Sequence, residues 1–287
     1  MRVSPARLAP ALLVAALAAL APRAAPAQDL EVDVELVLAV DISRSMDLEE
    51  LRIQRDGYVA ALRDPEVIRA IEGGLLGRIA VRYFEWAGPG RRGIDSGWTL
   101  LDGAASAQAF AEGLAEGRIS AAVGTSISGA IDFAVAAFEG NGFEGMRQVV
   151  DISGDGPNNA GRPVTAARDA AVAAGVVING LPLMMKANDG PFSLRELDIY
   201  YEDCVIGGPL SFVLPLWEQA KFPETIRRKL ILEIAAPRPV PSIRAPEPPS
   251  AIPAQLGLGP AARAPRIDCL IGEKRRQRWM EGGGWEW

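Results

Sequence analysis

The sequence contains no histidine and only two cysteines, Cys204 and Cys269. Without histidine, neither a Ser-His-Asp nor a Cys-His catalytic arrangement can form. Two cysteines are too few for a four-thiolate zinc site, and mixed Cys/His zinc sites are excluded as well. Any metal that this chain holds must therefore be bound by oxygen atoms, which favours hard cations such as Mg²⁺, Mn²⁺ or Ca²⁺.

Several sequence motifs of catalysis are also absent. The chain has no Walker-type phosphate-binding loop and no G-x-S-x-G nucleophile motif. The segment Asp41-Ile42-Ser43 lacks the second aspartate that a D-x-D phosphatase needs. No general base stands out, and no histidine can transfer protons. We therefore do not expect an enzyme.

The N-terminal segment has the pattern of a secretory signal peptide. Arg2 and Arg7 precede an apolar run at residues 8–21, and Ala25-Pro26-Ala27 supplies a small-x-small cleavage site. A membrane anchor is the alternative, but the run is shorter than the roughly 20 residues that span a bilayer. We expect cleavage of residues 1–27, secretion into the periplasm and no stable membrane insertion.

The charge of the chain argues against nucleic acid as a partner. The formal net charge changes from −6 to −9 on removal of residues 1–27, which contain three arginines and no acid. An acidic protein is repelled by nucleic acids and by anionic membranes. A short basic run at residues 274–278 is the exception, and we interpret it as a solvated tail.

Short apolar runs alternate with helix-length segments between residues 35 and 234. We predict strands at 35–40, 78–86, 97–101, 148–153, 176–181 and 211–214, with 97–101 at the sheet edge. We predict helices at 48–62, 104–115, 126–138, 163–174, 192–201 and 217–234. This alternation indicates an α/β fold with a doubly wound, mostly parallel central sheet of about six strands and helices on both faces.

The composition divides the remaining chain into three parts. Residues 28–235 form the predicted domain, and residues 236–266, with nine prolines, form a Pro/Ala-rich linker. Residues 267–287 form a C-terminal tail that contains Cys269. In an oxidising compartment a disulfide between Cys204 and Cys269 is favoured over two thiols, and it would tie the tail back to the domain.

Five polar residues follow predicted strands or precede a predicted helix. Asp41, Ser43 and Ser45 form a D-x-S-x-S motif directly after the first strand, Thr125 precedes a helix, and Asp155 follows the strand at 148–153. Singly, Ser45 and Thr125 could be helix caps and Asp155 a turn residue. In open α/β sheets, however, ligands bind beyond the carboxyl ends of the strands. Three such features at one edge therefore favour a shared site.

At these positions the chain resembles the von Willebrand factor type A domain family. That family has a metal-ion-dependent adhesion site built from D-x-S-x-S, a distant threonine and an aspartate in a D-G pair. The resemblance covers about residues 33–234. Within it, FEWAGPG, GTSISGAIDFA, DISGDGPNNAGRPVTAARDAA and YYEDCVIGGP resemble a secreted bacterial subgroup with no assigned function. The resemblance to the type A family implies a Rossmann-like fold and a divalent metal, which is Mg²⁺ or else Mn²⁺ or Ca²⁺. The residues that would bind the metal are Asp41, Ser43, Ser45, Thr125 and Asp155.

The donor set suggests how such a metal would act. Three neutral hydroxyls and two carboxylates leave the cation electron-poor and one coordination position open, and an acidic side chain of a protein or peptide ligand can fill that position. We therefore expect a binding or adhesion module outside the cytoplasm. Two alternatives stay open. One is a phosphoester hydrolase, which would need a second metal or a base, and the other is a structural module whose metal only orders the loops.

Four features beside the motif have two interpretations each. Asp151, in an apolar strand, either orients a metal ligand or pairs with an arginine. Gly154 stands where many relatives have a hydroxyl-bearing residue, for which Ser153 is the candidate substitute. Residues 157–159 either contact a ligand or, as we favour, form a turn. Trp86 either shapes ligand specificity or, as we favour, lies in the interior.

Overall fold

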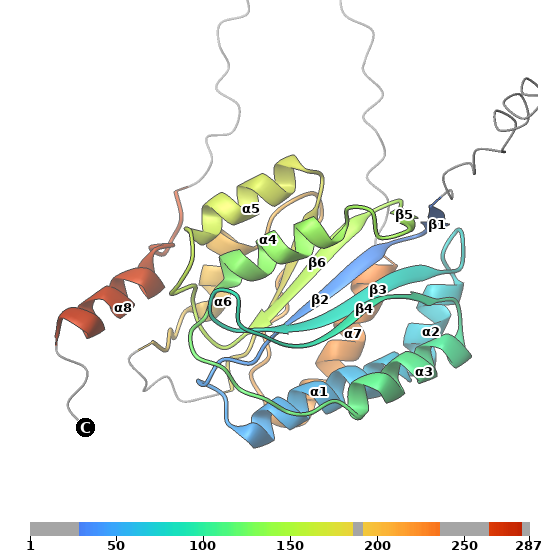
Figure 1. The fold of residues 1–287 in the computed structure, drawn as a ribbon, viewed down its shortest axis with the longest axis horizontal. Coiled ribbons are helices and arrows are strands. Elements are labelled where there is room, and N and C mark those ends of the chain that lie inside the picture. The colour runs from blue at the N-terminus through green and yellow to red at the C-terminus, as the bar shows by residue number, and fades with distance from the viewer. Residues whose placement is uncertain (1–28, 186–191, 236–263, 283–287) are drawn as a thin grey trace, which may run out of the picture.

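The computed structural model describes residues 29–185, 192–235 and 264–282 (Figure 1). The expected signal peptide, most of the expected linker and the last residues of the tail lie outside the described residues. Within the described ranges, no helix combines the length and the apolar character needed to cross a bilayer.

The centre of the fold is a five-stranded sheet with the order β4-β3-β2-β6-β7. Strands β3, β2, β6 and β7 run parallel to one another. Strand β4, at one edge, pairs antiparallel with β3. A separate parallel pair joins β1 to β5. The strands are β1 (Leu30–Val32), β2 (Glu35–Asp41), β3 (Ile79–Trp86), β4 (Arg92–Leu101), β5 (Phe143–Gly145), β6 (Gln148–Gly154) and β7 (Val177–Pro182).

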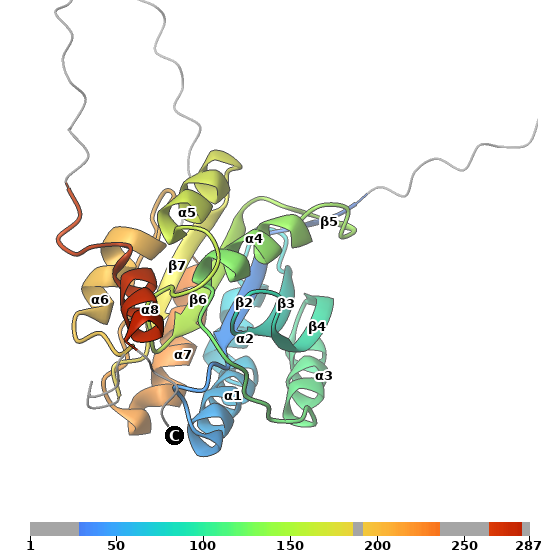
Figure 2. The ribbon, with the colours of Figure 1, turned by 60° about the vertical axis from the view of Figure 1, so that its left-hand side comes forward.

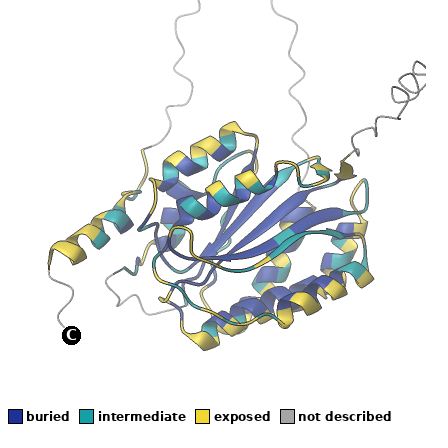
Figure 3. Ribbon diagram, in the orientation of Figure 1, coloured by how far each residue is buried: buried dark blue, intermediate teal, exposed yellow. Residues whose placement is uncertain are grey.

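Helices cover both faces of this sheet (Figures 1 and 2). One face packs against α1 (Leu48–Leu62), α2 (Pro65–Glu72), α3 (Ala104–Ala115) and α7 (Phe222–Ile234). The other packs against α4 (Ile127–Ala137), α5 (Val164–Ala173) and α6 (Leu197–Tyr200). Each face therefore has its own apolar core. Strands β2, β3, β6 and β7 between the cores are almost entirely buried, whereas the edge strand β4 is mostly half-buried (Figure 3). The predicted α/β fold with a mostly parallel sheet is confirmed.

The central strand β2 shows why its sequence reads as a continuous apolar run. All seven residues are buried, because a parallel strand between two helical layers has no solvent-facing side. Leu38 and Val40 belong to the first core, whereas Val37 and Ala39 belong to the second. Since side chains alternate along a strand, Asp41 shares the face of Val37 and Ala39.

The predicted sixth strand does not form. Val213 and Leu216 make only isolated bridges, to Gly180 and Leu183. Leu214 and Leu216 donate their N–H groups to the carbonyls of Gly180 and Pro182, both at 3.0 Å. Between these two bonds the ladder is interrupted, because Pro182 of β7 has no N–H to donate. The sheet consequently has five strands rather than about six, while the predicted edge strand is present and longer than expected.

Helical segments also differ from the prediction in length and number. The stretch predicted at 192–201 is helical only at α6, which continues into a π-helical turn, Tyr201–Val205. A 3-10 turn, Gln219–Lys221, precedes α7, and Pro223 occupies the first turn of that helix. Two helices were not predicted, namely α2 and, in the tail, α8 (Ile271–Glu281).

The predicted disulfide between Cys204 and Cys269 is confirmed. It joins the π-helical turn to the segment that precedes α8, across a sequence separation of 65 residues. Ile267, Cys269 and Ile271 pack against the second core. The start of the tail is therefore part of the folded unit, and α8 lies beside α6 in Figure 2.

Candidate metal site

The parallel strands end together at one edge of the sheet. Asp41, the last residue of β2, pairs with Trp86 of β3, and Gly154 of β6 pairs with Pro182 of β7. The chain passes from β2 to β3 on one side and later to β6 on the other, which makes this edge beside β2 the switch point of the sheet. Asp155 follows β6 at the same place. Trp86 is 2% exposed and lies in the second core, as expected for an interior aromatic.

Four of the five predicted residues form one chain of hydrogen bonds. The carboxylate Oδ1 of Asp41 accepts from the backbone N–H of Ser43 at 2.7 Å. The hydroxyl oxygens of Ser43 and Ser45 are 2.8 Å apart, and Ser45 Oγ donates to Asp155 Oδ1 at 2.6 Å. Asp41 and Ser43 are buried, whereas Ser45 is exposed and Asp155 half-buried. The group therefore extends from the core to the surface.

Thr125 reaches the same rim through its backbone. Its N–H donates to Oδ1 of Asn159 at 3.0 Å, and the N–H of Asn159 donates back to the Thr125 carbonyl at 2.9 Å. The next residue, Ser126, donates its N–H to the carbonyl of Ala87, just beyond β3. The loop after Asp155 and the end of β3 thus hold Thr125 from two sides.

The loop before α4 is also fastened to the D-x-S-x-S loop. The N–H of Ala122 donates to the Ile42 carbonyl at 2.9 Å. Gly88 approaches this loop so closely that a Cβ would lie 2.5 Å from the Val123 carbonyl oxygen, and Gly124 has a φ of +89°. A larger residue at either glycine would push the loop outward. These contacts bring the Thr125 loop to the Asp41 loop.

The interpretation of Ser45 and Thr125 as helix caps is wrong, because their neighbours cap the helices. Asp47 caps α1 and accepts from two backbone N–H groups of the first turn, both at 2.9 Å. Ser126 caps α4 and accepts from the N–H of Gly129 at 3.2 Å.

The electrostatics of the rim suit a bound cation. Burial, and then the nearby Asp155 carboxylate, raise the pKa of Asp41 well above its ordinary value. The Oδ2 atom of Asp41 is buried and has no hydrogen-bond partner in the described part of the chain. A divalent ion would compensate both carboxylates, and a donor set of hydroxyl and carboxylate oxygens fits Mg²⁺, Mn²⁺ or Ca²⁺. The described residues contain no group of three or more acidic or cysteine side chains suited to a metal.

Asp151 and Ser153 face away from this site. The Nζ atom of Lys229, in α7, lies 2.9 Å from Asp151 Oδ1 and also contacts Glu233. Asp151 therefore pairs with a lysine, and neither interpretation made from the sequence was right. Burial, and then Glu233, raise the pKa of Asp151 to about 7 although Lys229 opposes them. Since strand side chains alternate, Ser153 shares this face and cannot substitute for a hydroxyl at Gly154.

The two asparagines after Asp155 do more than form a turn. Asn158 is fully buried, and its Oδ1 accepts from the N–H of Ser128 at 3.0 Å while its Nδ2 donates to Glu273 at 2.7 Å. A guanidinium N–H of Arg276 donates to the Asn159 carbonyl at 3.3 Å. Helix α8 therefore holds the loop of the candidate site, and its basic run is not simply a solvated tail. No local pattern in the sequence indicates this long-range contact.

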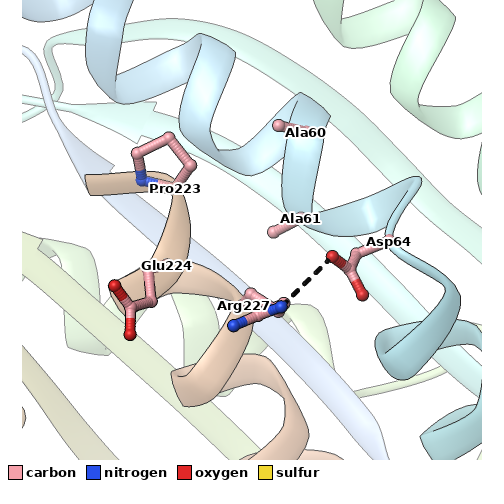
Figure 4. A pocket seen from close by; sticks show the side chains of 6 residues that line it. All are labelled: Ala60, Ala61, Asp64, Pro223, Glu224 and Arg227. Carbon is pink, nitrogen blue, oxygen red and sulfur yellow. Dashed lines mark ion pairs between the residues drawn. The ribbon is translucent and has the colours of Figure 1, made fainter. Parts of the chain in front are cut away.

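A pocket of about 280 Å³ lies elsewhere, between α1, α7 and the start of α2 (Figure 4). Arg227 and Asp64 form an ion pair at 3.7 Å across it. Ala60, in its wall, follows Leu48, the first residue of α1, by twelve positions, which places it about 18 Å along the helix from the end that adjoins the D-x-S-x-S loop. This pocket is not part of the metal site. Its lining residues are Ala60, Ala61, Asp64, Pro223, Glu224 and Arg227.

Comparisons with known proteins agree with this architecture. A family model described as "Protein of unknown function (DUF1194)" matches residues 31–238. No curated protein matches the sequence significantly. Among solved structures, proximal thread matrix protein 1 from the mussel byssus is 14% identical with a TM-score of 0.50, and the match covers 73% of this chain and 49% of that protein.

Two further structures have lower scores. A second structure of the mussel protein, described as having a zinc-occupied MIDAS motif, has 14% identity, a TM-score of 0.47 and coverage of 73% and 50%. A von Willebrand factor type A protein from Catenulispora acidiphila has 16% identity, a TM-score of 0.46 and coverage of 71% and 43%. This chain thus spans about half the length of the mussel protein. The match to the mussel protein at a TM-score of 0.50 agrees with the predicted α/β fold.

Proposed function

This chain belongs to the family described as "Protein of unknown function (DUF1194)", and we propose that it is a metal-dependent binding module. In this proposal a divalent cation binds at the strand-end rim and coordinates an acidic side chain of a protein or peptide ligand. The metal residues are Asp41, Ser43, Ser45, Thr125 and Asp155.

One observation carries the proposal: the hydrogen-bond chain from Asp41 through Ser43 and Ser45 to Asp155, which joins two loops that are 110 residues apart in sequence. Its oxygens belong to hard donors, and its outer end is open to solvent. Mg²⁺ suits such a site because it prefers oxygen ligands and retains waters that an incoming group can replace. The cation would supply the positive charge that a ligand carboxylate binds.

The proposed location is outside the cytoplasm. The Cys204–Cys269 disulfide supports an oxidising compartment, and residues 1–27 have the signal-peptide pattern. We further propose that residues 28–235 form the binding domain and 236–266 a linker. The contacts of α8 with the domain extend the folded unit into the tail.

The test is a calorimetric titration of Mg²⁺, Mn²⁺ and Ca²⁺ into residues 28–287. We expect one ion per chain, and we expect no binding in the double variant Asp41→Ala, Asp155→Ala. A matched double variant, Glu112→Ala, Asp169→Ala, removes two exposed acids away from the rim and should bind as the wild type does. Failure of the wild type to bind any divalent ion would contradict the proposal.

A second experiment separates ligand binding from a purely structural metal. In Ser43→Ala, we expect weaker retention of Asp-containing and Glu-containing peptides in Mg²⁺, with the unfolding midpoint in EDTA unchanged. The same peptides with Asn and Gln in place of the acids serve as controls. A metal that only orders the loops would instead give no difference between the acidic and amide peptides.

A further inference from the structure

Two buried oxygens meet beside Gly154. Asp41 Oδ2 and the hydroxyl of Tyr201 both lack a hydrogen-bond partner among the described residues. A Cβ on Gly154 would lie 2.9 Å from each of them, so the two oxygens are no farther apart than twice that distance. Buried polar atoms are nearly always paired, and an exception usually marks a place where a water or an ion belongs.

The Tyr201 ring reaches this place by packing against two glycines of neighbouring strands. Gly180 of β7 lies so close to the ring that a Cβ would be 2.6 Å from Tyr201 Cδ1. Gly154 and Gly180 stand on neighbouring strands, with Gly180 opposite Ile152 in the pairing. A side chain at Gly180 would block the ring, and one at Gly154 would block the hydroxyl. The absence of a Cβ at Gly154 and at Gly180 thus allows Tyr201 to approach Asp41.

Packing alone does not explain a tyrosine here. Phenylalanine would fill the same space without burying a hydroxyl. Because a buried hydroxyl without a hydrogen bond costs free energy, the hydroxyl of Tyr201 needs a partner. The residue is 0% exposed and opens the π-helical turn that the Cys204 disulfide holds. Single π-helical turns are rare and are found often at functional sites.

We propose that Tyr201 is a positioning residue of the metal site: its phenol O–H faces the Oδ2 side of Asp41 across the space left by Gly154 and would donate to it when the carboxylate turns to meet a cation. It would fix the orientation in which the Asp41 carboxylate meets the cation, as partners of metal ligands commonly do. This inference rests on the proposed function.

The first test compares Tyr201→Phe with Tyr58→Phe. Tyr58 is the matched control because its hydroxyl is also buried without a hydrogen-bond partner in the described structure, but it belongs to the core on the other face. In calorimetric titration, we expect Tyr201→Phe to bind Mg²⁺ about tenfold or more weakly than the wild type. Tyr58→Phe should retain wild-type affinity. In EDTA, both variants should unfold at or above the wild-type midpoint.

A second test fills the space between the two oxygens. A Cβ at Gly154 would lie 2.9 Å from Asp41 Oδ2 and from the Tyr201 hydroxyl, so we expect Gly154→Ala to weaken Mg²⁺ binding as Tyr201→Phe does. Adding Tyr201→Phe to Gly154→Ala should weaken binding little further, because both changes act on one contact. The inference is overturned if Tyr201→Phe binds Mg²⁺ as the wild type does while Asp41→Ala, Asp155→Ala does not bind. That result would leave the proposed function intact. A wild type that binds no divalent ion would overturn both.

Discussion

Hydroxyl groups outnumber carboxylates in the candidate metal site, and this ratio shapes its chemistry. Asp41 is buried, and burial and the Asp155 carboxylate raise its pKa. The hydroxyls of Ser43 and Ser45 continue the hydrogen-bond chain toward the surface, where Ser45 donates to Asp155. Few direct charges would leave a bound cation able to attract an acidic group from another molecule. The side chain of Asp41 is held by a backbone N–H of its own loop, whereas Ser43 and Ser45 are held by hydrogen bonds between side chains that reach Asp155 in another loop.

The pH dependence of stability should reveal the buried group of Asp151, Lys229 and Glu233. Two carboxylates share one ammonium there, and the pKa of Asp151 rises to about 7 from an ordinary 3.8. Because the folded state binds this proton more tightly than the unfolded chain, the contribution is full below the ordinary pKa and is lost as pH rises through 7. The unfolding free energy should fall by up to about 1.4 kcal/mol per pH unit across that window.

Urea unfolding in EDTA, measured at several pH values across that window, checks this prediction. Asp151→Asn should remove this part of the pH dependence, whereas Asp169→Asn, an exposed acid, should keep it. Identical slopes in Asp151→Asn and the wild type would show that Asp151 does not take up the proton.

At the scale of elements, α8 and the loop after β6 act as a pair. The buried Asn158 connects this loop to the first turn of α4 and to Glu273 of α8. The disulfide holds the start of the tail close to the π-helical turn. The loop that carries Asp155 and braces Thr125 is therefore supported from a segment more than a hundred residues further along the chain.

Removal of the disulfide should destabilise the protein through the unfolded chain. For a separation of 65 residues, Cys204→Ala, Cys269→Ala should lower the unfolding free energy by about 2–4 kcal/mol. Denaturant unfolding measures this value, and dithiothreitol should lower the wild type toward the variant. An unfolding free energy equal to that of the wild type would mean that the bond contributes nothing.

Helix α8 lies so close to the loop after β6 that no side chain should fit at Gly272. A Cβ there would lie 2.1 Å from the Asn158 carbonyl oxygen. Gly272→Ala should therefore increase amide hydrogen exchange in α8 and in residues 156–160. The matched control is Gly113→Ala, in α3, where a Cβ meets nothing within 4 Å and helix propensity should stabilise by about 0.4–1 kcal/mol. Unchanged exchange in Gly272→Ala would show that this contact is not made.

At the scale of the whole molecule, the sheet brings together residues from widely separated segments. The switch in strand order beside β2 places Asp41 and Asp155 at one edge, and two apolar cores hold the layers in place. The candidate site therefore exists only in the folded state. Binding of a cation there must stabilise the entire fold.

Metal should accordingly raise the temperature of unfolding. At a free Mg²⁺ concentration of one hundred times Kd, linkage gives about 2.7 kcal/mol of stabilisation. For a domain of this size that corresponds to a rise in Tm of roughly 5–10 °C. Differential scanning calorimetry in Mg²⁺ and in EDTA measures the difference. The variant Asp41→Ala, Asp155→Ala should show none, and an equal rise in that variant would point to binding elsewhere.

Local patterns in the sequence predicted the strands of the sheet and the site motif. The apolar run before Asp41 predicts a buried strand because such a strand is covered on both faces. Ser43 and Ser45 follow Asp41 within one loop, so short-range geometry brings them together. Alternating strands and helices then predict that Thr125 and Asp155 lie at the same edge.

Only the tertiary structure decided which partners these residues have. The pairing of Asp151 with Lys229, the approach of Tyr201 to Asp41 and the contact of α8 with Asn158 join segments that no periodic pattern relates. The predicted strand at 211–214 was wrong because its own pattern does not show that its neighbour β7 ends in Pro182, which has no N–H to continue the backbone pairing. Periodicity reports which face of an element is buried, whereas long-range contacts depend on how the layers pack, and this packing is specified by the whole chain at once.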